Sequence, residues 1–148
     1  NIIKMLNFNQ KIKFKTIEIS FHIHSTEELD KSIRIICDNL KMPIERKNET
    51  KLIGAFNNEI KKITFILQKS ECDIFLNNLV DKMMKAYKKE IIEQIDNHID
   101  IKGIIYLRVD KQRLIKNEIV MGINDIVRIK MKAQTKNDLR ENMIKLLS

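Results

Sequence analysis

The sequence contains very little glycine and proline. Among its 148 residues there are three glycines and one proline. The glycines, Gly54, Gly103 and Gly122, stand far apart in the chain. A loop that cradles phosphates with its backbone N–H groups needs several closely spaced glycines. The sequence therefore gives no indication of a nucleotide-binding loop of that kind.

Cysteines and long apolar runs are also scarce. Cys37 and Cys72 are the two cysteines, and each occupies an apolar position of an expected helix. We expect buried thiols in a reducing cytoplasm rather than a disulfide. No apolar run approaches the ~20 residues that span a bilayer, so no membrane contact is expected. Residues 1–10 lack the apolar core and the cleavage site of a secretory signal.

Basic charge, in contrast, is abundant and unevenly placed. The chain has 28 Lys and Arg against 20 Asp and Glu, a formal net charge of +8. Residues 101–148 hold eleven bases and five acids, which is a net +6. The hydrophobic fraction of 43% is typical of a folded globular chain. A basic region concentrated in one third of such a chain indicates an anionic partner.

Hydrophobic periodicity predicts five strands and three helical regions. Strict alternation at 17–23 is typical of a half-buried strand, and a change of phase upstream predicts a bulge near Lys15–Thr16. The other strands are expected at 44–52, 61–68, 104–109 and 125–133. Helical spacing covers 25–40, 70–99 and 135–147.

Two features of the helical regions are specific enough to check. Ser25 or Thr26 is expected to cap the first helix, and Thr135 or Asn137 the last. The middle region is long for a small domain, so we expect a break or kink near 84–88. Residues 110–124 read as a polar connection. The order of elements predicts one α+β domain over residues 1–148, a two-layer sandwich with helices on one face of a mostly antiparallel sheet.

A basic ridge on the last strand is the strongest functional candidate. Arg128, Lys130 and Lys132 alternate with apolar residues, so they share one face at about 6.8 Å spacing. If the strands at 104–109 and 125–133 pair as a hairpin, preceding cations extend that ridge. The expected RNA-binding residues are then Arg108, Lys111, Arg113, Lys116, Arg128, Lys130 and Lys132. The alternative is an ordinary solvated face in a lysine-rich protein.

Other chemistry has weaker support in the sequence. His22 and His24 share the polar face of a strand, but no third metal ligand is near them in the sequence. Asp110 has neither a nucleophile nor a second carboxylate beside it, and such a strand-terminal Asp is more often a turn or helix cap. Tyr106 either stacks on a base or packs in the core. We therefore expect no catalytic residue, no metal and no cofactor.

The C-terminal half resembles a known family. The segments "YLRVDKQ" at 106–112 and "DIVRIKMK" at 125–132 are similar to matching strands of the archaeal predicted RNA-binding proteins often described as exosome-associated. The likeness extends over roughly residues 16–147. It implies a fold like that of ribosomal protein L5 and a role in RNA binding. The link after "DKQ" is bulkier here than in the family.

Two functional hypotheses lead at this point, and a third, an enzyme, has only Asp110 and the neighbouring His22 and His24 in its favour. The first is a non-catalytic protein that holds RNA phosphates through its basic face, in connection with RNA processing or the exosome. The second is a protein-interaction subunit of a larger RNA-processing assembly. In that case the ridge meets an acidic protein surface, and the edge strand at 44–52 could pair with a partner strand.

Overall fold

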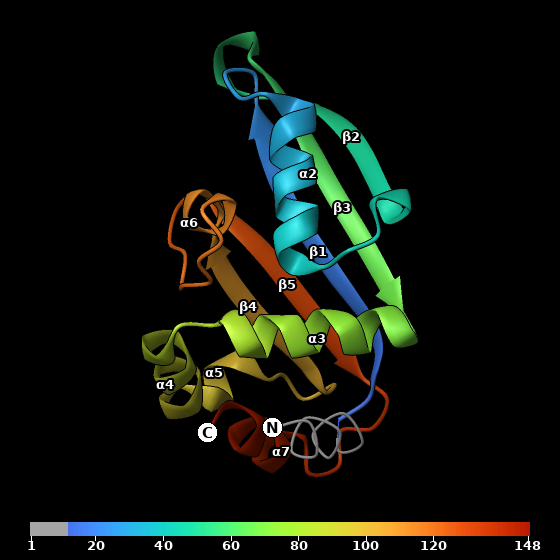
Figure 1. The fold of residues 1–148 in the computed structure, drawn as a ribbon, viewed down its shortest axis with the longest axis vertical. Coiled ribbons are helices and arrows are strands. Elements are labelled where there is room, and N and C mark those ends of the chain that lie inside the picture. The colour runs from blue at the N-terminus through green and yellow to red at the C-terminus, as the bar shows by residue number, and fades with distance from the viewer. Residues whose placement is uncertain (1–11) are drawn as a thin grey trace.

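The computed structural model describes residues 12–148, which form a five-stranded antiparallel sheet and several helices (Figure 1). The strands are ordered β2-β3-β1-β5-β4 across the sheet. They are β1 (Phe14–His24), β2 (Lys47–Ile53), β3 (Glu59–Gln68), β4 (Ile104–Asp110) and β5 (Ile126–Ala133). The helices are α2 (Leu29–Leu40), α3 (Ser70–Lys82), α4 (Lys85–Glu93), α5 (Ile95–His98), α6 (Lys111–Ile115) and α7 (Leu139–Leu147), with 3-10 turns η1 (Ile44–Arg46) and η2 (Ala55–Asn57). The expectation about a secretory signal concerns residues outside this range.

The helices α2 and α3 lie on one face of the sheet (Figure 1), and the opposite, open face carries exposed side chains such as Ile66 and Tyr106. The alternating apolar residues of β1 point toward these helices, and Ile17, Ile19 and Phe21 are buried there. Phe21 stacks on Phe65 of β3, with ring centroids 6.5 Å apart. The polar residues of the same strands lie on the opposite face. The predicted α+β architecture, with an antiparallel sheet and helices on one face, is confirmed.

Two predicted irregularities are present. The register between β1 and β5 shifts between Phe14 and Thr16, which confirms the bulge. The long helical region ends at Lys82 and resumes at Lys85, because Met83 and Met84 are extended. The Met84 N–H donates to the carbonyl of Ile119 at 3.0 Å, so the break is held by a strand-like contact.

Both predictions of helix caps are wrong. Helix α2 begins after Glu28 and has no side-chain cap, instead of being capped by Ser25 or Thr26. The carboxylate of Glu27 accepts the backbone N–H of His24 at 3.0 Å, which makes the preceding residues a turn. Helix α7 begins after Asp138, which has a left-handed backbone conformation (φ 57°). Sequence patterns find the helices, but the chain uses a turn before each of them.

The two edges of the sheet differ. Carbonyls on the outer side of β4 accept hydrogen bonds from neighbouring segments. Asp100 donates its N–H to Ile104 at 3.0 Å, Gly122 donates its N–H to Arg108 at 3.0 Å, and the Tyr87 hydroxyl donates to Arg108 at 2.9 Å. Within residues 12–148 no strand pairs with the outer side of β2. The sheet therefore has one covered edge and one bare edge.

The cysteines lie in the core, as their apolar helix positions predicted. Cys37 and Cys72 are buried free thiols, and burial raises the pKa of Cys37 to about 12 and that of Cys72 to about 11. Thiols that stay protonated at neutral pH are poor nucleophiles. Among the helices of the described range, none has the length and apolar character needed to cross a membrane.

Candidate nucleic-acid interface

The alternation of β5 places its three cations on the open face of the sheet. Val127, Ile129 and Met131 are buried beneath the helices, while Arg128, Lys130 and Lys132 are exposed. The neighbouring strand β4 pairs with β5 in antiparallel register. The hairpin on which the predicted ridge depends is therefore present.

The register of this hairpin sets two arginines opposite each other. Arg108 of β4 is the direct partner of Arg128 of β5. The backbone groups of Arg108 are bonded on the outer side of β4, to Tyr87 and Gly122, so the two arginines form a non-hydrogen-bonded pair. Side chains are closest in such pairs, and like charges placed there repel each other. An anion between the two guanidinium groups would relieve this repulsion.

The surroundings of the arginine pair do not neutralise it. Ser20 is the next residue across the sheet from Arg128, followed by Thr64 of β3. None of the ion pairs found within residues 12–148 uses an open-face cation of the β4–β5 hairpin. Glu18 is the cross-strand neighbour of Lys130 and is the nearest acidic position in that register. The pair is thus a concentrated and unpaired positive charge.

A shallow hollow of about 450 Å³ surrounds these side chains. It is lined by Glu18, Ser20, Asn97, Tyr106, Leu107, Arg108, Arg128, Ile129 and Lys130. Tyr106 is 42% exposed, and its hydroxyl donates a hydrogen bond to Asp100 at 3.1 Å. This bond raises the pKa of Tyr106 and fixes the ring at the rim of the hollow. The hollow offers three cations, the carboxylate of Glu18, amide and hydroxyl groups and one aromatic ring.

Lys111 corrects the predicted binding set. Its side chain is completely buried. Its ammonium donates to the carbonyl of His22 at 2.6 Å and to Glu27 at 2.9 Å, and it lies 3.2 Å from a carboxylate oxygen of Asp125. A lysine with all its hydrogen-bonding capacity used internally has none left for a phosphate. Lys111 instead joins β1, the turn before α2 and the segment before β5.

Arg113 and Lys116 also lie apart from the ridge. Helix α6, which carries Arg113, packs beside α2 in the helical layer, where the Leu114 carbonyl accepts a hydrogen bond from Asn39 at 2.8 Å (Figure 1). Arg113 forms a two-point contact with Glu118, at 3.2 and 2.7 Å. Lys116 is exposed at the end of the same helix. The predicted set is therefore reduced on the open face to Arg108, Arg128, Lys130 and Lys132.

Asp110 is the N-cap residue of α6. Its carboxylate accepts the backbone N–H of Arg113 at 2.9 Å. This is the cap role that the sequence suggested, although residues 110–124, read as a polar connection, include this short helix and the buried Leu114 and Ile119. The carboxylate of Asp110 therefore stabilises the first turn of α6.

His22 and His24 form no recognisable metal site. Within residues 12–148 no group of three His, Cys, Asp or Glu side chains is placed to hold a metal ion. His22 lies on the open face opposite Lys62 of β3. Desolvation lowers the pKa of His22, and the charges of Arg128 and Lys62 lower it further. His22 therefore adds a neutral imidazole to this face at neutral pH.

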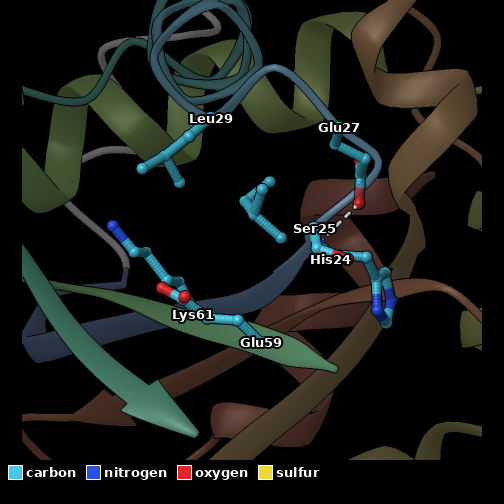
Figure 2. Close-up of a pocket in the computed structure, with 7 residues that line it drawn as sticks. His24, Ser25, Glu27, Leu29, Glu59 and Lys61 are labelled. Atoms are coloured by element: carbon cyan, nitrogen blue, oxygen red, sulfur yellow. Dashed lines mark hydrogen bonds between the residues drawn. The ribbon is translucent and has the colours of Figure 1, made fainter. Parts of the chain in front are cut away.

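A second hollow, of about 260 Å³, lies at the turn between β1 and α2 (Figure 2). Glu27 and His24 contribute to its wall from the turn, and Glu59 and Lys61 from the start of β3. The hydrogen bond from the His24 N–H to Glu27 crosses its rim. Its two acids and one lysine give it a mixed charge, unlike the basic hollow on the open face.

Sequence patterns missed the neutral part of the candidate interface. The alternation of β1 predicts that Ser20 shares a polar face with Glu18 and His22. Its position beside Arg128 depends on the register between β1 and β5. Asn97 reaches the hollow from α5, at the covered edge of β4. Neither the hairpin register nor the position of α5 leaves a signal in the local sequence.

The fold and this face define a class: an α+β protein with an antiparallel sheet and an open surface of unpaired cations. The family described as RNA binding matches residues 16–135, and the chain belongs to that family. The RNA-binding protein PAB1135 of Pyrococcus abyssi (strain GE5 / Orsay) is 26% identical over 141 residues, covering 91% of this chain and 92% of that protein.

Solved structures give the same picture of the fold. Protein SSO0741 from Sulfolobus solfataricus is similar with a TM-score of 0.76 at 26% identity, covering 90% of this chain and 97% of that one. Protein AF2318 from Archaeglobus fulgidus has a TM-score of 0.71 at 26% identity, covering 90% and 96% of the two chains. The likeness extends over nearly the whole of each molecule.

Proposed function

We propose that this protein binds single-stranded RNA, without catalysis, by holding phosphates on the open face of the β4–β5 hairpin. The observation that carries the proposal is the direct opposition of Arg108 and Arg128. A bridging phosphate can accept hydrogen bonds from two guanidinium groups, which converts a repulsive pair into a charge-assisted contact. Lys130 and Lys132 continue the same face along β5 and suit the neighbouring phosphates.

The composition of the face favours reading of backbone and shape over reading of sequence. Tyr106 is the aromatic residue of the hollow and offers one ring for stacking a base. Ser20 and Asn97 supply neutral hydrogen-bonding groups beside the arginine pair. Membership of an RNA-binding family supports RNA as the anion. The resemblance to exosome-associated proteins supports a place in cytoplasmic RNA processing.

The salt dependence of binding tests this proposal. We would measure the fluorescence anisotropy of labelled single-stranded RNAs at several salt concentrations for the wild type and for Arg128→Ala/Lys130→Ala/Lys132→Ala. Each single-strand phosphate contact contributes about 0.7 to the slope of log K against log salt, so the triple change should lower its magnitude by about 2. The affinity at low salt should fall with it.

A charge-matched variant separates the face from the net charge. Lys31→Ala/Arg34→Ala/Lys85→Ala also removes three positive charges, from exposed positions of α2 and α4. It should keep the wild-type slope, apart from a small uniform loss. Equal losses in both variants, or no binding of the wild type at low salt, would contradict the proposed site.

An acidic protein surface is the second candidate for the same face. Unpaired cations such as Arg108 and Arg128 suit a carboxylate cluster as well as phosphates. A partner from an RNA-processing assembly that co-purifies after nuclease treatment, and is lost with the triple variant, would favour this candidate. Binding of purified RNA by the isolated protein favours the first.

A further inference from the structure

The bare edge of the sheet presents a regular row of backbone groups. The Gly54 N–H donates to the Asn58 carbonyl at 2.8 Å, which fixes the alternation of hydrogen bonds along the β2–β3 hairpin. The backbone groups of Asn48, Thr50 and Leu52 therefore point toward β3, and those of Glu49, Lys51 and Ile53 point outward. An edge of this kind accepts another strand.

The side chains of this edge are self-complementary. In an antiparallel pairing of two β2 strands about a two-fold axis at Thr50, Glu49 of each copy lies opposite Lys51 of the other. Thr50 then lies opposite Thr50, and opposed threonines and opposite charges are both favourable cross-strand pairs. The outward backbone groups of Glu49 and Lys51 come into register in the same arrangement. One register thus satisfies both the backbone and the charges.

The isolated chain sets two lysines in one cross-strand pair beside this edge. Lys51 lies directly opposite Lys61 of β3. Each of the two lysines has one carboxylate 3.7 Å away, Glu59 for Lys51 and Glu49 for Lys61, and Glu49 also lies 2.9 Å from Lys47. A Glu49 from a second copy would lie on the free side of Lys51 and offset this repulsion. Lysines on an edge strand repel most other strands, so the complementary Glu49 makes the edge selective for its own sequence.

Exposed apolar residues flank the same edge. Phe56, at the tip of the β2–β3 hairpin, is 97% exposed, and Ile53 is 74% exposed. Ile44, just before β2, is 45% exposed. Antiparallel pairing sets the Ile44 end of each strand beside the Phe56 tip of the other. Burial of apolar surface at both ends would add to the strand pairing.

We propose that two copies of this chain associate through β2, in antiparallel register about Thr50, to form a dimer with a continuous sheet. The occupant of the edge is a second copy because the charges of Glu49 and Lys51 complement themselves in that register. The dimer places two open faces on one extended sheet surface. The inference does not depend on RNA binding, since it uses none of the cations of β4 and β5.

Charge reversal tests the register. Sedimentation velocity over a range of protein concentrations should show a dimer for the wild type. Glu49→Lys and Lys51→Glu should each shift the protein to monomer, because each sets like charges opposite each other. An equimolar mixture of the two variants should form dimers again, since every opposed pair is then of opposite charge. Glu45→Lys, which makes the same charge change just outside β2, should leave the dimer intact.

A disulfide test does not depend on charge. Thr50 faces its own copy in a non-hydrogen-bonded pair, where Cα atoms are about 4.5 Å apart, a distance that a disulfide spans. Thr50→Cys should therefore form a covalent dimer under mild oxidation. Asn48→Cys, on the same exposed strand, should not, because its counterpart in the second copy is several residues away. The native thiols, Cys37 and Cys72, are buried and should not interfere.

Several results would contradict the proposed dimer. A wild-type protein that stays monomeric at all concentrations, with no covalent dimer from Thr50→Cys, overturns the proposal. Dimers that survive both charge reversals, or that cross-link equally through Asn48→Cys, also overturn it, because they require another interface or register. Circular dichroism of each variant would confirm that the sheet is folded.

Discussion

Two groups of basic residues in the last third of the chain behave in opposite ways. At the β4–α6 junction two cations have carboxylate partners: Lys111 has Glu27 and Asp125, and Arg113 has Glu118. On the open face, Arg108 has another arginine instead. Local net charge alone therefore does not identify a binding surface. What matters is whether the fold brings a carboxylate within reach of each cation.

The largest expected effect comes from removing the buried member of the first group. Lys111→Met keeps the apolar stem but leaves Glu27 and Asp125 without their shared cation. Removing one partner of a buried ion pair costs about 3–5 kcal/mol. Because the side chains of Glu27 and Asp125 are 18% and 36% exposed, we expect about 3 kcal/mol. Urea unfolding measures it, and Lys130→Met on the open face should change stability by less than about 0.5 kcal/mol.

The next effect concerns Asp110, between the two groups. Asp110→Ala removes the cap of α6 and should lower the free energy of unfolding by about 1 kcal/mol. Asp110→Asn should cost much less, because an asparagine side chain also caps a helix. RNA affinity should stay unchanged in both variants, by the same anisotropy assay. A loss of binding in a stable Asp110→Asn protein would mean that this carboxylate has a role beyond the turn.

The third effect is a gain in stability, whereas most substitutions lower the stability of a protein. Arg108→Thr removes one member of the repelling pair, so the free protein should gain about 0.2–1 kcal/mol of stability in low salt. The gain should shrink at high salt, because exposed charges are screened. The same variant should bind RNA more weakly. Lys132→Thr, whose cross-strand neighbours are Thr16 and Ile104, is the matched change and should give no such gain. A destabilised Arg108→Thr protein would show that the pair is not repulsive.

The smallest expected effect is the titration of His22. Its pKa in the folded protein lies below the ordinary value of 6.5, through desolvation and the charge of Arg128. The unfolded chain therefore takes up the proton first as the pH falls. The associated stability is fully present above pH 6.5 and is lost as the pH falls toward the folded pKa. NMR titration of the imidazole should show this low pKa, and Arg128→Ala should raise it. An unchanged pKa of His22 in Arg128→Ala would mean that the charge of Arg128 does not act on this imidazole.

Local patterns predicted much of this fold because they follow from short-range geometry. Alternation in β1 and β5 gave the correct faces, and the phase change gave the bulge. The break near Met84 followed from helix length alone. The missed features depend on distant contacts: Lys111 is buried by Glu27, 84 residues away in the chain. A four-residue polar run after a strand looks the same whether its lysine faces water or a buried carboxylate.

The candidate site was predictable to a similar extent. The period of β5 was enough to place Arg128, Lys130 and Lys132 on one surface. The pairing of Arg108 with Arg128 was not, because a β4–β5 connection that includes α6 leaves the register open. The short helix α6 was missed for the same reason that helices of one turn usually are. It makes too few apolar repeats to stand out from a loop.

The covering of the β4 edge limits how far the sheet can grow. Within residues 12–148, Tyr87, Asp100 and Gly122 bond to backbone groups on its outward side, so these groups are not available to a further strand. A two-fold contact at β2 would use the open edge of both molecules at once. The dimer would then have a β4 edge at each end of its sheet, and a third molecule would find no free strand edge to pair with. The hydrogen bonds that fix the position of Arg108 would thus also prevent further strand addition and the growth of fibres.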